Sequence, residues 1–168
     1  MSRGFVNEDD QEEIPMVPPR ADLPVGVTNY VTPQGLDELL AEKKTLHTEK
    51  EQLPKENEKE RRIASNLISA KLQLLNGRIN SAKVVTLKEQ PSDEIRFGAC
   101  VSLRIGNAKS LQKFQIVGVD EANIAKQKLS FLSPIAKILI SKRVGDIAVL
   151  QLGKEERIFE IKGISYGG

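Results

Sequence analysis

The sequence has no tryptophan, one cysteine and one histidine, and aromatic residues make up only 4% of its 168 residues. So few aromatic side chains argue against a base-stacking platform or an aromatic-lined ligand pocket. The lone Cys100 has no partner for an intramolecular disulfide, as is typical of a reducing cytoplasm, and we expect it to be a small buried residue of a strand. His47 has no cysteine or second histidine at ligand spacing, which argues against a zinc site.

Long apolar runs and a strong net charge are also missing. No stretch approaches the length of a membrane-spanning helix, and the N-terminus carries charges where a signal peptide has an apolar core. The net charge of +2 is too small for a protein that wraps nucleic acid. With 39% hydrophobic and 29% charged residues, we expect a soluble, intracellular protein that is partly elongated or disordered.

Residues 1–31 have the composition of a flexible arm. They hold four prolines and six acidic side chains against two arginines, a net charge of −4, and they show no helix or strand period. We therefore expect a disordered acidic segment. Its apolar patch, residues 14–17, leaves two interpretations open: a docking motif for a partner, or simply part of a solubilising tail.

Residues 32–85 carry the pattern of an antiparallel helical hairpin. Thr32 is a good N-cap, and Pro33 suits a first helical position. Apolar residues then recur in two seams with the spacing of packed helices, separated by a polar stretch. The first seam is Leu36, Leu39, Leu46 and Leu53, interrupted by Lys43 and Lys50, and the second is Ile63, Leu67, Ile68, Leu72, Leu75, Ile79 and Ala82.

These seams predict two helical arms of equal length. The arms are 33–53 and 63–83, with 21 residues each, or about 31 Å at 1.5 Å per residue. Equal arms allow each seam to bury itself against the other. The turn lies within 54–62, unless Pro54 starts the second helix and moves the turn a few residues earlier.

A polar linker, residues 86–95, precedes a segment in which the spacing of the apolar residues changes. From residue 96 to residue 168 apolar residues approach the alternation of β-strands, around 99–105, 113–117, 128–131, 147–152 and 157–164. Ser133 and Pro134 are an N-cap and first-turn pair that opens a short helix over 135–141. The pattern predicts a small antiparallel sheet with one helix, and therefore an α+β domain.

Six short motifs follow one another in this domain: Phe97-Gly98-Ala99, Ile116-Val117-Gly118, Asp120-Glu121-Ala122, Ser133-Pro134-Ile135-Ala136-Lys137, Val144-Gly145-Asp146 and Ile164-Ser165-Tyr166. With a helical hairpin that ends in Ser81-Ala82-Lys83-Val84-Val85, they resemble the GreA/GreB transcription elongation factors. The resemblance covers nearly all of 96–168 and the architecture of 32–85. The acidic arm has no counterpart in the family pattern.

The resemblance implies an FKBP-like fold for 96–168 and a factor that is not itself an enzyme. In that family this domain docks at the rim of the secondary channel of bacterial RNA polymerase, and the hairpin enters the channel. Two acidic tip residues help to hold a second Mg²⁺, shared with the polymerase, which then cleaves its own backtracked RNA. We therefore expect a cytoplasmic monomer that binds polymerase and regulates elongation, with weak nucleic-acid contact, no membrane contact and no cofactor of its own.

The hairpin tip departs from the family at one position. The family has an Asp three residues before the Glu of a Glu-Asn pair, so matching that pair to Lys55-Glu56-Asn57 places Leu53 where the Asp should be. Glu56, Glu58 and Glu60 are the candidate tip carboxylates. However, 54–62 holds four basic and three acidic side chains, a net +1 that disfavours delivery of a further Mg²⁺. Two versions stay open: stimulation of RNA cleavage, or channel binding that modulates transcription without cleavage.

The candidate polymerase-docking residues lie where the family contacts its partner: Leu132, Ser133, Pro134 and Ile135, with Asp120 and Glu121. An equally simple interpretation is that the first four residues only end a strand, cap a helix and pack in the core. The last two would then be an ordinary acidic turn. An FKBP-type prolyl isomerase is an alternative suggested by fold analogy alone. Direct nucleic-acid binding is another, because 86–168 carries 13 basic and 9 acidic side chains, a net +4.

Overall fold

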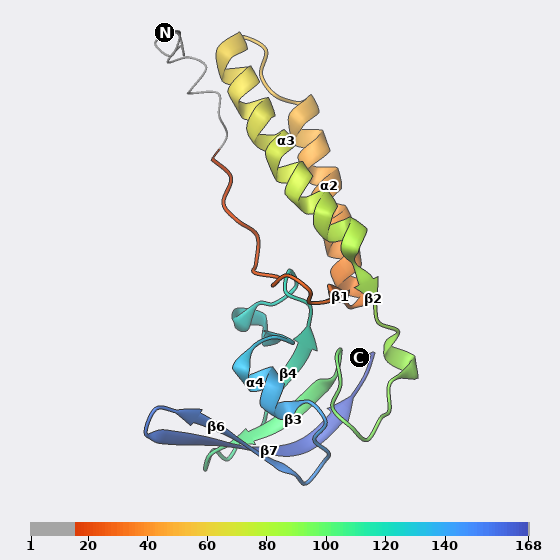
Figure 1. The fold of residues 1–168 in the computed structure, drawn as a ribbon, viewed down its shortest axis with the longest axis vertical. Coiled ribbons are helices and arrows are strands. Elements are labelled where there is room, and N and C mark those ends of the chain that lie inside the picture. The colour runs from red at the N-terminus through yellow and green to blue at the C-terminus, as the bar shows by residue number, and fades with distance from the viewer. Residues whose placement is uncertain (1–15, 168) are drawn as a thin grey trace. The chain divides into compact units, whose positions relative to one another are not determined.

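The computed structural model describes residues 16–167, which divide into two compact units. The hairpin unit comprises 16–22 and 37–81, and the sheet unit comprises 23–36 and 82–167. The architecture is α+β, with two long helices and a curled mixed β-sheet (Figure 1). None of the helices within 16–167 combines the length and apolar character needed to traverse a lipid bilayer.

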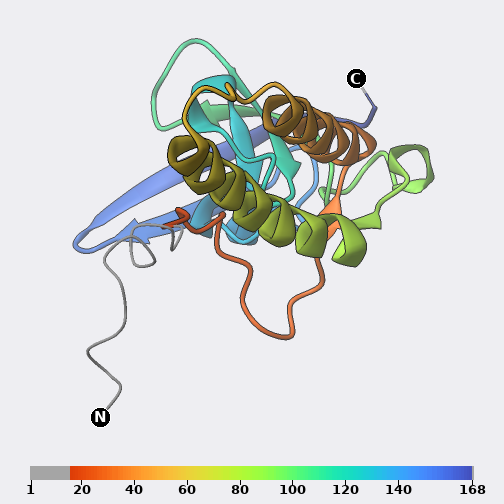
Figure 2. The same ribbon diagram turned by 90° about the horizontal axis from the view of Figure 1, so that it is seen from above.

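The predicted helical hairpin is confirmed, but its first helix is shorter than predicted and its second helix starts and ends earlier in the chain. Helix α2 spans Pro33–Glu51 and helix α3 spans Glu58–Ser81, and they lie side by side in both views (Figures 1 and 2). The turn is residues 52–57, so Pro54 lies in the loop and does not start a helix. Helix α3 begins earlier than predicted because the Asn57 side chain accepts a hydrogen bond from the Glu60 N–H at 3.1 Å and caps it.

The hairpin is held together by the two seams that the sequence predicted. Leu39 and Leu46 of α2 are buried, as are Ile68, Leu72 and Leu75 of α3. The lysine positions of the first seam lie at its margin, where the ammonium group of Lys50 donates to the Ser69 hydroxyl of α3 at 2.9 Å. Because Leu75 is fully buried, truncating it to alanine would cost about 3 kcal/mol.

The expectation of a flexible arm over 1–31 is wrong for its second half. Arg20 forms an ion pair with Glu42 of α2 at 2.7 Å, and the Arg78 guanidinium of α3 donates to the carbonyl of Ala21. In the sheet unit, β1 (Tyr30–Val31) pairs in parallel with β2 (Lys83–Val84). Residues 1–15, including the start of the apolar patch, lie outside the described residues.

The main sheet has five strands in the order β5-β4-β3-β7-β6. Their bounds are Cys100–Ile105 for β3, Gln112–Val117 for β4, Lys128–Ser130 for β5, Ile147–Leu152 for β6 and Glu155–Ser165 for β7. A single-turn 3₁₀ helix, η2 (Leu87–Glu89), lies in the predicted linker. The short helix α4 spans Pro134–Leu139, close to its predicted place.

The prediction of a purely antiparallel sheet is wrong at one edge. Strand β5 pairs with β4 in parallel, while β3 pairs antiparallel with both β4 and β7. Instead of a tight hairpin, a ten-residue connection links β4 to β5 and contains the 3₁₀ turn η3 (Ile124–Lys126). That length lets the chain return along β4 as far as Gln115, which pairs with the first residue of β5, and a two-residue hairpin loop does not allow this return.

The core of the sheet unit lies on the face of the sheet that carries Val101, Leu103, Ile116 and Phe159, with Ala136 and Leu139 of α4 packed into it. The expected burial of Cys100 is wrong: it is half-buried. Side chains alternate along a strand, and Val101 and Leu103 occupy the inward positions of β3, so the neighbouring Cys100 faces the other way.

Candidate functional site: the hairpin tip and the loop before helix α4

The three candidate carboxylates at the hairpin tip do not converge. Glu56, Glu58 and Glu60 are all exposed, the first in the turn and the other two in the first turn of α3. Residues two apart on a helix point to different sides of it. Within 16–167, no three His, Cys, Asp or Glu side chains are grouped so that they could hold a metal ion.

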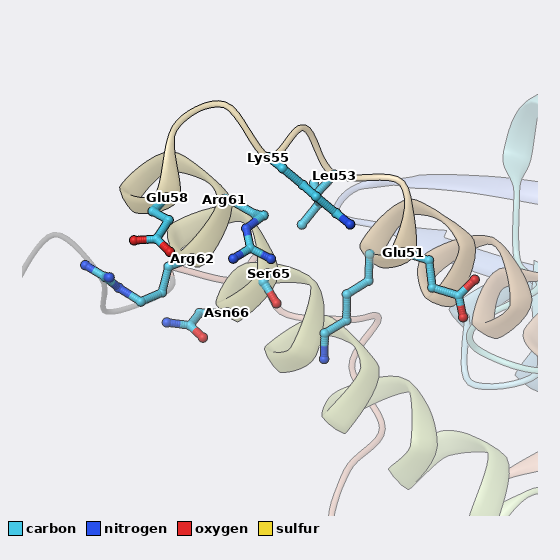
Figure 3. A pocket seen from close by; sticks show the side chains of 9 residues that line it. Glu51, Leu53, Lys55, Glu58, Arg61, Arg62, Ser65 and Asn66 are labelled. Carbon is cyan, nitrogen blue, oxygen red and sulfur yellow. The ribbon is translucent and has the colours of Figure 1, made fainter.

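A cavity of about 490 Å³ lies beside these carboxylates, and its lining is basic. It holds four cationic side chains, Lys50, Lys55, Arg61 and Arg62, against the carboxylates of Glu51 and Glu58. Ser65 and Asn66 add hydrogen-bond donors, and Leu53 lines one wall. In Figure 3 the Arg61 guanidinium lies in the middle of the group, while the Glu51 carboxylate points away from it.

Sequence reasoning found the basic character of the tip but not this cavity. The net charge counted over the turn included Lys55, Arg61 and Arg62, whereas Lys50, Ser65 and Asn66 come from the bodies of the two helices. Only the packing of α2 on α3 brings these side chains together. Leu53 is half-buried, so the position that resembles the family's Asp contributes an apolar wall.

The loop before α4 presents the second group of candidate residues. The Ser133 hydroxyl accepts a hydrogen bond from the Ala136 N–H at 3.2 Å and caps α4, with Pro134 in the first turn. Pro134 is exposed, and Leu132, Ser133 and Ile135 are half-buried. These four positions therefore combine a structural role with partial access to solvent.

Asp120 and Glu121 differ sharply in exposure. The Glu121 side chain is only 3% exposed and forms an ion pair with Lys128 at 3.1 Å. It also accepts a hydrogen bond from the Thr32 hydroxyl at 2.5 Å, and that hydroxyl in turn accepts from the Gly35 N–H at 2.9 Å. Thr32 is thus the N-cap that the sequence predicted, and Glu121 is its internal partner. Asp120 is half-buried.

Three aromatic rings support the loop before α4. The rings of Tyr30, Phe97 and Phe131 contact one another with centroids 5.5 to 5.8 Å apart, and the Lys83 ammonium lies 5.9 Å from the Tyr30 centroid. Phe131 directly precedes Leu132. Sequence reasoning missed Tyr30 because it lies in the segment assigned to the arm, although an apolar pair just before an N-cap was a usable signal.

Two partly buried groups of the sheet unit, the Tyr166 hydroxyl and the Cys100 thiol, have raised pKa values. The Tyr166 hydroxyl donates to the Glu94 carbonyl at 2.5 Å and accepts from the Arg96 N–H at 2.8 Å. Burial raises the pKa of Tyr166, against a smaller lowering by that N–H. Burial also raises the pKa of the Cys100 thiol, although Lys113 and Lys128 act in the opposite direction. The thiolate, which is the reactive form, is therefore disfavoured.

Comparison with known proteins identifies the class to which this chain belongs. The family model described as "Transcription elongation factor, GreA/GreB, C-term" matches residues 90–166. GreA of Halorhodospira halophila is 36% identical over 106 residues, covering 62% of this chain and 67% of that protein. GreA of Desulfovibrio desulfuricans is 27% identical over 157 residues, covering 87% and 95%.

The match to a further relative covers a slightly smaller share of that relative's length. GreA of Maricaulis maris is 32% identical over 100 residues, which are 60% of this chain and 64% of that protein. The solved structure of GreA factor homolog 1 from Thermus thermophilus aligns with 81% of this chain and 97% of its own, at 23% identity and a TM-score of 0.39. On the sequence matches, the chain belongs to the GreA/GreB family of bacterial transcription elongation factors.

Proposed function

We propose that this protein binds bacterial RNA polymerase at its secondary channel and regulates elongation in the cytoplasm, without being a catalyst itself. The observation that carries the proposal is the family match over 90–166, which contains the whole five-stranded sheet and the loop before α4. The confirmed hairpin supports it, because two packed helices supply a stiff element of the kind that the family places in the channel.

The docking surface in this proposal is the loop before α4. Leu132 and Ile135 supply partly exposed apolar groups on either side of Ser133 and the exposed Pro134, the mixture typical of the edge of a protein interface. Asp120 is retained as a candidate at the neighbouring loop. We assign Glu121 a structural role, because its carboxylate is used inside the sheet unit by Thr32 and Lys128.

The tip chemistry favours the version of this function without RNA cleavage. The family uses tip carboxylates to hold a shared Mg²⁺, but here the three exposed glutamates do not form a metal-binding group. The neighbouring cavity has four cationic side chains and only two carboxylates. The excess positive charge repels a divalent cation. These residues do not fit a Mg²⁺ site, so the proposed action is occupation of the channel, which modulates pausing, initiation or the access of other factors.

A pull-down with core RNA polymerase tests the docking surface. Ser133→Asp adds a negative charge but keeps a good N-cap, and Pro134→Ala removes the exposed ring, so the double variant should fold and recover far less polymerase. Ser110→Asp, at an exposed position of the β3–β4 loop, is the matched control. Full recovery by the double variant would remove this loop as the docking surface. Failure of the unaltered protein to bind would overturn the proposal as a whole.

A second assay separates the two versions of the function. Backtracked elongation complexes incubated with the protein and Mg²⁺ should keep full-length RNA while binding of the protein is confirmed. Shortened RNA that disappears with Glu56→Ala would establish the cleavage version instead.

The FKBP-like character of the sheet unit stays a prediction, and a fold alone does not establish isomerase activity. The unit has an apolar cavity of about 440 Å³, but none of its lining residues is aromatic; they include Thr32, Leu87 and Cys100. Isomerases of that fold use an aromatic-lined pocket, so we expect no catalysis in a proline-isomerisation assay.

A further inference from the structure

We propose that the basic cavity at the hairpin tip binds the polyphosphate chain of a nucleoside triphosphate. This inference goes beyond the proposed function, because it concerns binding by the protein on its own. It rests on four cationic side chains gathered around one cavity by the end of α2, the turn and the first turns of α3.

The charge of the cavity is the first argument. Lys50, Lys55, Arg61 and Arg62 outweigh the two carboxylates of the lining by two charges, and Figure 3 shows that the Glu51 carboxylate and the Arg62 guanidinium are both directed away from Arg61. A single exposed ion pair contributes little. Several cations that share one concave surface add their potentials, and the effect is largest for a ligand that carries several negative charges close together.

The second argument is the supply of hydrogen-bond donors. The Arg61 guanidinium presents a planar fork that matches phosphate oxygens, while Lys55 acts as a point charge. The Ser65 hydroxyl and the Asn66 amide add neutral donors from the next turn of α3. The ammonium group of Lys50 donates a hydrogen bond to the Ser69 hydroxyl of α3 at 2.9 Å, which links the end of α2 to α3 beside the cavity.

Size and charge density favour a polyphosphate over a nucleic-acid strand. The cavity of about 490 Å³ lies within the range of small-molecule sites, about 300 to 1,000 Å³. A nucleic-acid backbone spreads single charges along its length and is bound by grooves that follow it. A triphosphate concentrates its charges within one short group, which suits a single basic cavity at the end of a hairpin.

Binding of inorganic tripolyphosphate and of ATP, each with and without Mg²⁺, to the full-length protein tests the proposal by calorimetry at low salt. The site variant is Lys55→Gln with Arg61→Gln, both at exposed positions, and folding is checked by circular dichroism. Lys44→Gln, an exposed lysine in the middle of α2, is the matched control. Each lost charge-assisted contact should weaken binding about tenfold, whereas the control should bind like the unaltered protein.

Three results would overturn the proposal. One is the absence of binding to tripolyphosphate and ATP at low salt. Another is an equal loss of affinity in the Lys44→Gln control, which would indicate diffuse attraction to the whole hairpin. The third is tighter binding of a short single-stranded RNA without a terminal triphosphate, because that outcome assigns the cavity to a nucleic-acid backbone. None of these depends on whether the protein binds polymerase, so failure here is distinguishable from failure of the proposed function.

Discussion

Replacing Glu121 with alanine should destabilise the sheet unit by about 3 kcal/mol. The change removes the acceptor of the 2.5 Å hydrogen bond from Thr32, whose side chain is buried, and a hydrogen bond to a charged group contributes about 1.5 to 3 kcal/mol. It also leaves the Lys128 ammonium, on a side chain only 16% exposed, without its carboxylate partner. Removing one partner of a fully buried pair costs about 3 to 5 kcal/mol. Because Lys128 is partly exposed, we expect a loss of stability at the lower end of this range.

Urea unfolding followed by tyrosine fluorescence measures this loss selectively. The chain has two tyrosines and no tryptophan, and both Tyr30 and Tyr166 lie in the sheet unit. With a slope of about 2 kcal/mol per molar urea, the midpoint should fall by about 1.5 M. Glu121→Gln retains an acceptor for Thr32 but loses the charge that faces Lys128, so its midpoint should fall by roughly half as much.

The control for this experiment is Glu89→Gln, an exposed glutamate of the same unit, which should change stability by less than about 0.5 kcal/mol. If Glu121→Ala unfolds at the same urea concentration as the unaltered protein but loses polymerase binding, the structural role assigned to Glu121 is refuted. Glu121 would then be a docking residue.

Gly118→Ala should destabilise the sheet unit by about 3 kcal/mol in urea unfolding, because the new methyl group would overlap the backbone carbonyl oxygen of Tyr30. Gly77→Ala is the opposite case: Gly77 lies in α3 with open space around it, so the change should stabilise the hairpin by about 0.5 to 1 kcal/mol. Tyr166→Phe should cost about 1 to 2 kcal/mol near neutral pH. The fold raises the pKa of Tyr166 by favouring its neutral form, so this contribution is complete below the unfolded pKa of about 10 and is lost as pH rises through the folded pKa; a difference that persists undiminished at high pH would contradict this. Cys100 should react with iodoacetamide at pH 8 more slowly than the same thiol in urea, because burial raises its pKa; equal rates would disprove it.

The local patterns of the sequence were sufficient for the hairpin, the strands and the short helix. Leu39, Leu46, Ile68, Leu72 and Leu75 stand at helical spacing, and all five are buried. The strand predictions were close to the observed bounds because alternation is a property of neighbouring residues. The predicted helix ends were less accurate. The apolar seam placed the start of the second helix at residue 63, whereas α3 starts at Glu58 because the side chain of Asn57 caps it.

The sequence indicated where the candidate docking residues lie in the fold, but it did not indicate how buried each of them is. The loop before α4 is where the motif match indicated, whereas the adjacent Asp120 and Glu121 differ in burial although they are neighbours of like charge. The burial of Glu121 depends on Thr32, which lies 89 positions away in the chain. No pattern of neighbouring residues contains that pairing.

The sequence by itself determined which segments are helical, which are extended and which family the sheet unit resembles, because those properties follow from spacing and motifs along the chain. Only the tertiary structure decided that β5 runs parallel to β4, that Tyr30 packs on Phe97 and Phe131, and that cations from two helices surround one cavity at the tip. The physical reason is that each of these arrangements joins residues of different segments of the chain, and spacing along one segment does not show how that segment packs on another.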